Sequence, residues 1–283
     1  MHQIGIMQGR LSPPNDDRIQ FFPTDNWEDE FQLAAQAGFS CIEWLYDLHD
    51  AKNNPLASDD GVEAARSISQ QTGIIIESLC AHCFIEDPLG GRSDKDLQKL
   101  LQRIGWLLER AGSLGITRIV LPLEEASELD RQFEMDCLVD WMKQALDLAE
   151  KARIEIDIET TLAPRSLVAL LERLPHPLLK VNYDIGNSAG KGYRIEDEFN
   201  AYGDRIASVH IKDKLFGGPT VPIGNGAADF KLLASLLRKL DFSGAIVLEA
   251  ARGTPGDEFT WAKRNLDFVY RCFGSDRWKI TSI

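Results

Sequence analysis

The chain has 283 residues, of which 44% are hydrophobic, and its 31 basic and 44 acidic side chains give it a formal net charge of −13 at pH 7. A chain this acidic repels phosphate backbones, so we expect no nucleic-acid partner. No apolar run reaches the roughly 18 residues of a membrane helix, and the opening segment lacks the pattern of a signal peptide. Five scattered cysteines indicate reduced thiols in a cytoplasmic protein.

Short apolar runs alternate with longer amphipathic stretches along the whole chain. Asp25, Ser93 and Asp229 are predicted to cap the starts of three helices, and Gly38 and Gly73 to end two. We predict strands at 4–9, 41–46, 74–82, 118–123, 155–160, 180–184, 206–210 and 244–249. We predict helices at 26–37, 59–72, 93–111, 130–152, 163–174, 195–202, 229–240 and 258–272, and a surface extension at 275–283.

These repeats predict an α/β fold, a single (β/α)8 TIM barrel that forms one domain over residues 1–283. A closed barrel is favoured over an open doubly wound sheet because side chains at the ends of widely separated strands have to meet. The segment at 10–25 is long for a strand-to-helix connection. Its Phe21 and Phe22 are predicted either to form a hydrophobic lid or to cover the side of the barrel.

Four strands in the second half of the chain end in a side chain that can bind a metal ion. If side chains alternate along a strand, Glu159, Asp184, His210 and Glu249 are each the last or nearly last inward residue. Any one of them, taken alone, is an ordinary helix cap or a satisfied polar group. Four at equivalent places on consecutive strands predict a divalent metal site at one rim of the barrel.

The same alternation places Asp157, Asn182 and Ser208 one layer below that rim. A buried carboxylate is costly unless it is hydrogen-bonded or paired. We therefore predict that Asp157 bonds Asn182 or a neighbouring cation and so supports the metal ligands.

Three further residues are candidate substrate contacts. His82 ends the third strand at the same rim, where Glu43 is a candidate partner for it, and Lys212 shares the face of His210. Arg252 follows Glu249 closely and is a candidate for binding a phosphate or a hydroxyl group. A buried structural role is the alternative for His82 and the favoured one for Glu43, and capping of the strand end is the alternative for Lys212.

Two short motifs have a simple structural explanation. The amides of Gly224 and Gly226 are a candidate phosphate site, but a tight turn before the helix capped by Asp229 explains them equally well. Cys80 and Cys83 have C-x-x-C spacing, yet they do not open a helix and no second pair follows, so neither a redox pair nor a zinc site is expected.

The motifs of the second half carry a family resemblance. These are E-T-T at 159–161, Y-D-I-G-N at 183–187, V-H-I-K-D at 209–213, V-P-I-G-N-G-x-x-D-F at 221–230 and L-E-A-A-R at 248–252. Together they resemble the xylose-isomerase-like TIM barrels, a group of sugar isomerases, epimerases and related lyases. Within that group the chain most resembles ketose 3-epimerases, including the pentulose 5-phosphate 3-epimerases.

The resemblance implies a cofactor and a substrate class. The metal ligands of the family fall on Glu159, Asp184, His210 and Glu249, which implies a divalent ion such as Mn²⁺, Co²⁺, Mg²⁺ or Zn²⁺. A small sugar or sugar phosphate is the implied partner, and a homo-oligomer is expected by analogy alone. Some free-ketose epimerases carry a His where this chain has Asn187, and a second Glu where it has residues 162–165. These departures concern recognition of the first carbons of the substrate.

The implied reaction is proton transfer next to a carbonyl group. The metal would acidify the C–H bond beside a chelated ketose carbonyl, which allows an enediolate to form. Glu159 and Glu249 would act as catalytic residues on opposite faces, one removing the proton and the other returning it. The same site allows aldose–ketose isomerisation or loss of water, as in an inosose or dehydroshikimate dehydratase. An endonuclease IV-like enzyme would need a His-rich zinc cluster, and a non-catalytic sugar-binding barrel would not need two opposed glutamates.

Overall fold

The computed structural model describes residues 3–14, 18–89, 93–123 and 132–274. Its strands are parallel and pair in chain order, and β8 (Ala245–Leu248) closes the sheet onto β1 (Ile4–Met7). The predicted (β/α)8 barrel is therefore confirmed. The other strands are β2 (Cys41–Leu45), β3 (Ile75–Cys80), β4 (Arg118–Pro122), β5 (Glu155–Glu159), β6 (Leu179–Asp184) and β7 (Ile206–Ile211).

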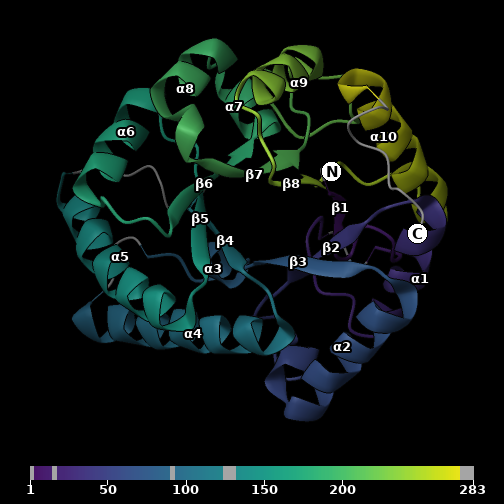
Figure 1. Ribbon diagram of the computed structural model, residues 1–283, viewed down its shortest axis with the longest axis horizontal. Coiled ribbons are helices and arrows are strands. Elements are labelled where there is room, and N and C mark those ends of the chain that lie inside the picture. The colour runs from purple at the N-terminus through teal and green to yellow at the C-terminus, as the bar shows by residue number, and fades with distance from the viewer. Residues whose placement is uncertain (1–2, 15–17, 90–92, 124–131, 275–283) are drawn as a thin grey trace.

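Helices surround the strands, and Figure 1 shows the larger ones as an outer ring. Within the described parts of the chain, no helix is long and apolar enough to cross a membrane. The helices are α1 (Trp27–Ala37), α2 (Asp59–Thr72), α3 (Cys83–Glu86), α4 (Asp94–Leu114), α5 (Gln132–Ala152), α6 (Pro164–Arg173), α7 (Ile185–Lys191), α8 (Ile195–Tyr202), α9 (Phe230–Lys239) and α10 (Glu258–Phe273), with 3₁₀ turns at Pro55–Ala57 and Gly203–Arg205.

Local sequence explains most of the helix ends. Ser93 and Asp229 accept hydrogen bonds from backbone N–H groups in the first turns of α4 and α9, as predicted. Gly38 ends α1 in the left-handed conformation, with a φ of 95°. The prediction for Asp25 was wrong, because α1 is preceded by Asn26, whose side chain makes no capping bond.

Two short helices, α3 and α7, are absent from the predictions because each begins within three residues of the end of a strand. In α7 the last residue of β6, Asp184, is also the N-cap, and its carboxylate accepts from the N–H of Asn187 at 2.9 Å. The predicted start of α5 at Asp130 and the predicted extension at 275–283 lie outside the described residues.

Aromatic packing explains the two phenylalanines of the segment after β1. Phe21 and Phe22 are both buried, and the ring of Phe22 lies 5.4 Å from that of Trp44 on β2. Trp27 of α1 packs on the same Trp44 ring at 5.6 Å. Phe22 therefore covers the side of the barrel and does not form a lid over its mouth.

Glu30 of α1 holds the segment that follows β1. Its carboxylate is buried and accepts hydrogen bonds from the N–H groups of Gly9 (2.8 Å) and Leu11 (3.0 Å) and from the hydroxyl of Ser12 (2.9 Å). Burial raises the pKa of Glu30 to about 7, although these three donors act in the opposite direction. The start of the segment is thus tied to α1 through one titratable group.

Stability should consequently depend on pH through Glu30. The pKa of Glu30 is higher in the folded protein than in the unfolded chain, so protonation of Glu30 stabilises the fold. This stabilisation is complete below the pKa of an ordinary glutamate and is lost as the pH rises through about 7. We expect the free energy of unfolding of the wild type, relative to Glu30→Gln, to fall by about 2 to 3 kcal/mol between about pH 5 and about pH 8. Urea titrations at both pH values measure this difference, and parallel pH profiles for the two proteins would contradict the assignment.

Candidate metal and substrate site

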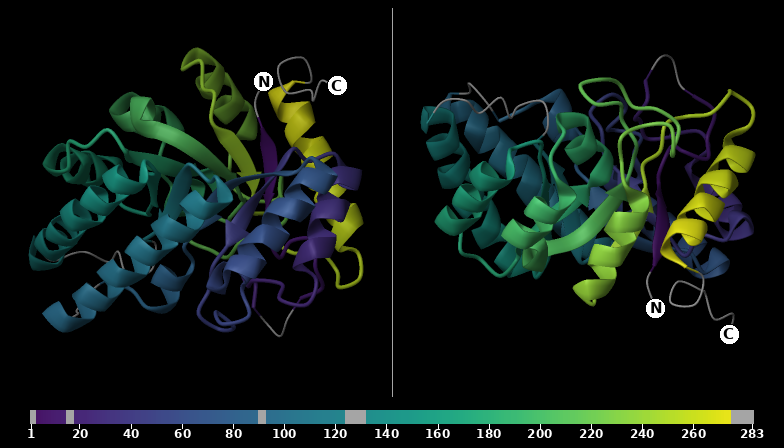
Figure 2. Two further views of the ribbon diagram at one scale, coloured as in Figure 1. Left: turned by 60° about the horizontal axis from the view of Figure 1, so that its bottom comes forward. Right: turned by 90° about the horizontal axis from the view of Figure 1, so that it is seen from above.

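Four predicted side chains meet at the carboxyl ends of the strands. Glu159 is the last residue of β5, Asp184 the last of β6, His210 the next to last of β7, and Glu249 directly follows β8. Each offers one possible ligand atom, and these atoms all lie within 4.8 Å of one another. The right view of Figure 2 shows the loops after β7 and β8 at one end of the barrel, the end at which these strands finish.

The imidazole of His210 is surrounded by carboxylates and is fully buried. Its Nδ1 atom lies 3.0 Å from Glu159 Oε2 and 3.1 Å from Glu249 Oε2. On the other side of the ring, Nε2 lies 2.9 Å from Glu43 Oε1. Burial lowers the pKa of His210, but the charges of Glu43 and Glu159 outweigh this effect, so the pKa lies well above its ordinary value.

Glu43 is a site residue whose partner was predicted wrongly. Its Oε1 faces His210, and its Oε2 accepts a 2.6 Å hydrogen bond from the hydroxyl of Ser78 on β3. The predicted partner was His82, because both residues lie toward the same end of neighbouring strands. The available sequence signal was alternation, which points Glu43 into the barrel but does not say which strand across the barrel its carboxylate reaches.

Both oxygens of the Glu159 carboxylate accept hydrogen bonds from amide groups. Asn182 Nδ2 donates to Oε2 at 2.9 Å, and Asn187 Nδ2 donates to Oε1 at 3.1 Å. Asn187, which stands where some relatives carry a His, therefore touches one of the predicted metal ligands.

Lys212 lies inside the cluster, at the rim where it was predicted. Its Nζ atom is 2.8 Å from Asp184 Oδ2 and 2.9 Å from Glu249 Oε2. Burial raises the pKa of Glu249, but Lys212 and His210 outweigh that effect and hold the pKa well below its usual range. Glu249 is accordingly ionised throughout the neutral range.

The layer below the cluster is polar and buried, as predicted, but its hydrogen bonds differ. Asp157 Oδ2 accepts from the hydroxyl of Ser208 at 2.6 Å, whereas the amide of Asn182 points up to Glu159. The predicted bond between Asp157 and Asn182 was therefore wrong. Burial raises the pKa of Asp157 to about 6, while Arg118 and Ser208 act in the opposite direction.

Arg252 holds the segment after β1 rather than lying free beside the cluster. Its three guanidinium nitrogens donate to the main-chain carbonyls of Ile19 (3.0 Å), Ser12 (3.1 Å) and Gly9 (2.6 Å), and its guanidinium stacks on the ring of Phe21. Burial, with Arg10 nearby, lowers the pKa of Arg252 to about 10. These bonds use three of its five N–H donors, and its role as a substrate contact stays a prediction.

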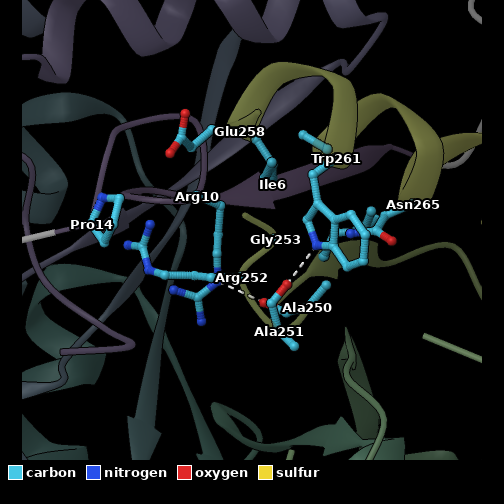
Figure 3. Close-up of a pocket in the computed structure, with 12 residues that line it drawn as sticks. Ile6, Arg10, Pro14, Ala250, Ala251, Arg252, Gly253, Glu258, Trp261 and Asn265 are labelled. Atoms are coloured by element: carbon cyan, nitrogen blue, oxygen red, sulfur yellow. Dashed lines mark hydrogen bonds between the residues drawn. The ribbon is translucent and has the colours of Figure 1, made fainter. Parts of the chain in front are cut away.

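Arg10 connects the same segment to the cluster. Its Nε donates to the carbonyl of Ala250 at 2.9 Å, and its Nη2 lies 4.0 Å from Glu249 Oε1. Figure 3 shows the bond to Ala250 as a dashed line, beside the bond from Trp261 to the carbonyl of Ala251. The stretch that carries Glu249 is therefore held between β1 and α10.

The remaining predictions have mixed outcomes. His82 precedes α3 and is half-buried, and its role as a substrate contact stays a prediction. The amides of Gly224 and Gly226 donate to Asp213 Oδ2 at 2.9 and 2.8 Å, so they form the tight turn and are not free to bind phosphate. Cys80 and Cys83 are buried free thiols, and Cys83 begins the short helix α3, which was not predicted from the sequence.

The family follows from comparison with known proteins. The family model described as "Xylose isomerase-like TIM barrel" matches residues 31–272. The chain belongs to this family. The resemblance found in the sequence motifs is thereby confirmed.

Sequence relatives carry names of sugar phosphate epimerases. The putative L-ribulose-5-phosphate 3-epimerase SgbU of Haemophilus influenzae is 25% identical over 98% of this chain and 95% of its own length. The L-ribulose-5-phosphate 3-epimerase UlaE of Salmonella paratyphi A is 26% identical over 79% of this chain and 81% of its own. These relatives support an enzyme of the isomerase class that acts on a sugar.

Solved structures of other proteins share the fold. The IolI protein, whose crystal structure has a bound zinc atom, superposes with a TM-score of 0.76 at 19% identity over 96% of this chain and 100% of that one. The D-psicose 3-epimerase of Clostridium cellulolyticum H10, solved with D-tagatose, superposes with a TM-score of 0.72 at 15% identity over the same shares. At these identities the comparison shows the fold alone.

The side chains of this family member fit a divalent cation. Three carboxylates and one imidazole are donors that such ions accept in proteins. His210 presents Nδ1 to Glu159 and Glu249 while Glu43 lies behind Nε2, which is how a metal-bound histidine is usually supported. Among the described residues carboxylates also outnumber cations in these contacts, because Glu43, Glu159, Asp184 and Glu249 lie beside three basic side chains, those of His210, Lys212 and Arg10.

Removal of the carboxylate behind His210 should weaken metal binding. We expect Glu43→Gln to lower the affinity for Mn²⁺ by about 10- to 100-fold, because Nε2 loses the charge that orients the ring. Titration calorimetry measures the affinity. Glu155→Gln, at the opposite end of the barrel beside Arg118, changes the net charge equally and serves as the control. Equal affinities in both variants would mean that His210 is not held as a metal ligand.

Proposed function

We propose that this protein is a divalent-metal-dependent sugar epimerase of the ketose 3-epimerase type. The observation that carries the proposal is the meeting of Glu159 and Glu249 in one cluster with Asp184 and His210. A binding protein needs a complementary pocket, but it does not need two carboxylates beside a cation site. The names of the sequence relatives add support for epimerisation of a ketose or its 5-phosphate.

Glu159, Asp184, His210 and Glu249 would hold the metal ion. When bound, the ion would polarise the carbonyl of the ketose and lower the pKa of the adjacent C–H bond. The donor set suits Mn²⁺, Co²⁺, Mg²⁺ and Zn²⁺ alike, since it combines carboxylate oxygens with one imidazole nitrogen.

The two glutamates would perform the proton transfers. One carboxylate removes the proton from the carbon next to the carbonyl, which leaves an enediolate, and the other returns a proton to the opposite face. Their surroundings differ, because Glu159 accepts from two neutral amides, whereas Glu249 lies beside Lys212 and near Arg10. Lys212 is the group best placed to donate to a substrate hydroxyl at this rim.

Solvent isotope exchange tests the reaction class. The protein is incubated with Mn²⁺, Co²⁺ or Mg²⁺ in D₂O and offered ketoses and ketose 5-phosphates, with L-ribulose 5-phosphate first. Deuterium at the carbon next to the carbonyl without loss of water supports the epimerase or isomerase. A product lighter by one water would identify a dehydratase instead. Tight binding with no exchange would identify a non-catalytic sugar-binding barrel.

Single substitutions should show which glutamate acts on which face of the substrate. We expect Glu159→Gln and Glu249→Gln each to lower epimerisation by about 10²- to 10⁴-fold, the usual loss for a missing acid–base group. In each variant the remaining glutamate can still remove and return a proton on its own face, so one epimer of the substrate should still take up deuterium. That epimer should differ between the two variants. Metal content is measured in parallel, because glutamine is a weaker ligand. Identical exchange patterns in the two variants would contradict opposed roles.

A further inference from the structure

The chain after β7 packs closely along one face of α7. Every second residue of this stretch, at 212, 214 and 216, packs against a glycine in α7 or at its C-terminal end. A Cβ atom at Gly186 would lie 2.7 Å from the Lys212 main chain, one at Gly190 3.3 Å from Lys214 Cβ, and one at Gly192 2.4 Å from the Phe216 ring. The glycines at 186, 190 and 192 thus leave the space in which Lys212 and Lys214 lie beside α7.

Lys214 occupies this space with its ammonium group next to Asn187. Its Nζ lies 3.5 Å from Asn187 Oδ1, and its aliphatic stem runs beside Gly190. The main chain is fixed, because the carbonyl of Lys214 accepts from the N–H of Ala227 at 2.9 Å and the residue pairs with Thr220. Among the described residues, no carboxylate forms an ion pair with Lys214, in contrast to Lys212.

These contacts fix which way the amide of Asn187 faces. An ammonium group can only donate and a carboxylate can only accept, so Oδ1 must face Lys214 and Nδ2 must face Glu159. The amide is thereby held at both ends, and it holds one oxygen of Glu159. Asn182 holds the other oxygen from β6, which leaves the carboxylate one orientation.

We propose that Lys214 is a positioning residue that acts through Asn187 to orient Glu159. The proposal rests on the proposed function, in which Glu159 is a metal ligand and an acid–base group. Within the part of the chain that the structure describes, Lys214 contacts neither the candidate ligand atoms nor any other member of the cluster. Its effect must therefore pass through the amide.

Co²⁺ is the probe for this proposal, because its visible absorption reports the arrangement of its ligands. We expect Lys214→Met, which keeps the stem and removes the charge, to shift the spectrum of the Co²⁺-loaded protein. We also expect kcat to fall by about 10-fold, as for other residues that orient metal ligands, with a smaller change in KM. Lys191→Met changes an exposed lysine at the end of α7 and is the matched control. It should leave the Co²⁺ spectrum and kcat unchanged.

A double-substitution cycle with Asn187→Ala tests the route. If Lys214 acts through Asn187, Lys214→Met should have no further effect on the Co²⁺ spectrum or kcat once the amide is gone. Independent effects in the double variant would overturn the proposal, and so would a rise in KM with an unchanged spectrum, which would make Lys214 a substrate contact. A wild type that binds no Co²⁺ would instead refute the proposed metal site itself.

Discussion

Buried negative charge at the end of a closed barrel is the constraint on which the rest of this structure depends. Carboxylates that leave water are costly unless cations or donors surround them. Here the strands of a parallel barrel bring Glu43, Glu159, Asp184 and Glu249 around His210, and Lys212 bridges two of them. The donors that stabilise these charges are also the groups that orient the candidate ligands, so stability and chemistry share the same contacts.

The segment after β1 completes the site from the opposite side. Glu30 binds the N–H groups at its start, and Arg252 binds three of its carbonyls. Arg10, carried by that segment, binds Ala250 and approaches Glu249. The first and last strands are neighbours in the barrel, so these contacts join two segments that are far apart in the sequence, next to Glu249.

The surroundings of the two glutamates suggest how one fold serves related reactions. Epimerisation, isomerisation and loss of water all begin with removal of a proton next to a carbonyl. What differs is which group returns a proton and to which atom. In this chain Asn187 and Lys214 both lie on the side of Glu159, Asn187 in direct contact with its carboxylate and Lys214 behind Asn187. Changes at that side can alter the orientation of one carboxylate without touching the other ligands.

The sequence by itself determined the barrel and the identity of the four candidate ligands. Strand alternation and strand ends are local properties, and in a parallel barrel all the carboxyl ends face one rim, so Glu159, Asp184, His210 and Glu249 could be grouped before any coordinates. Only the tertiary structure decided the partners around them. Glu43 reaches His210 across the barrel, Asp157 bonds Ser208, and Arg252 turns to the segment after β1. These contacts depend on barrel diameter, on side-chain rotamers and on loops far apart in sequence, and no local pattern encodes any of the three.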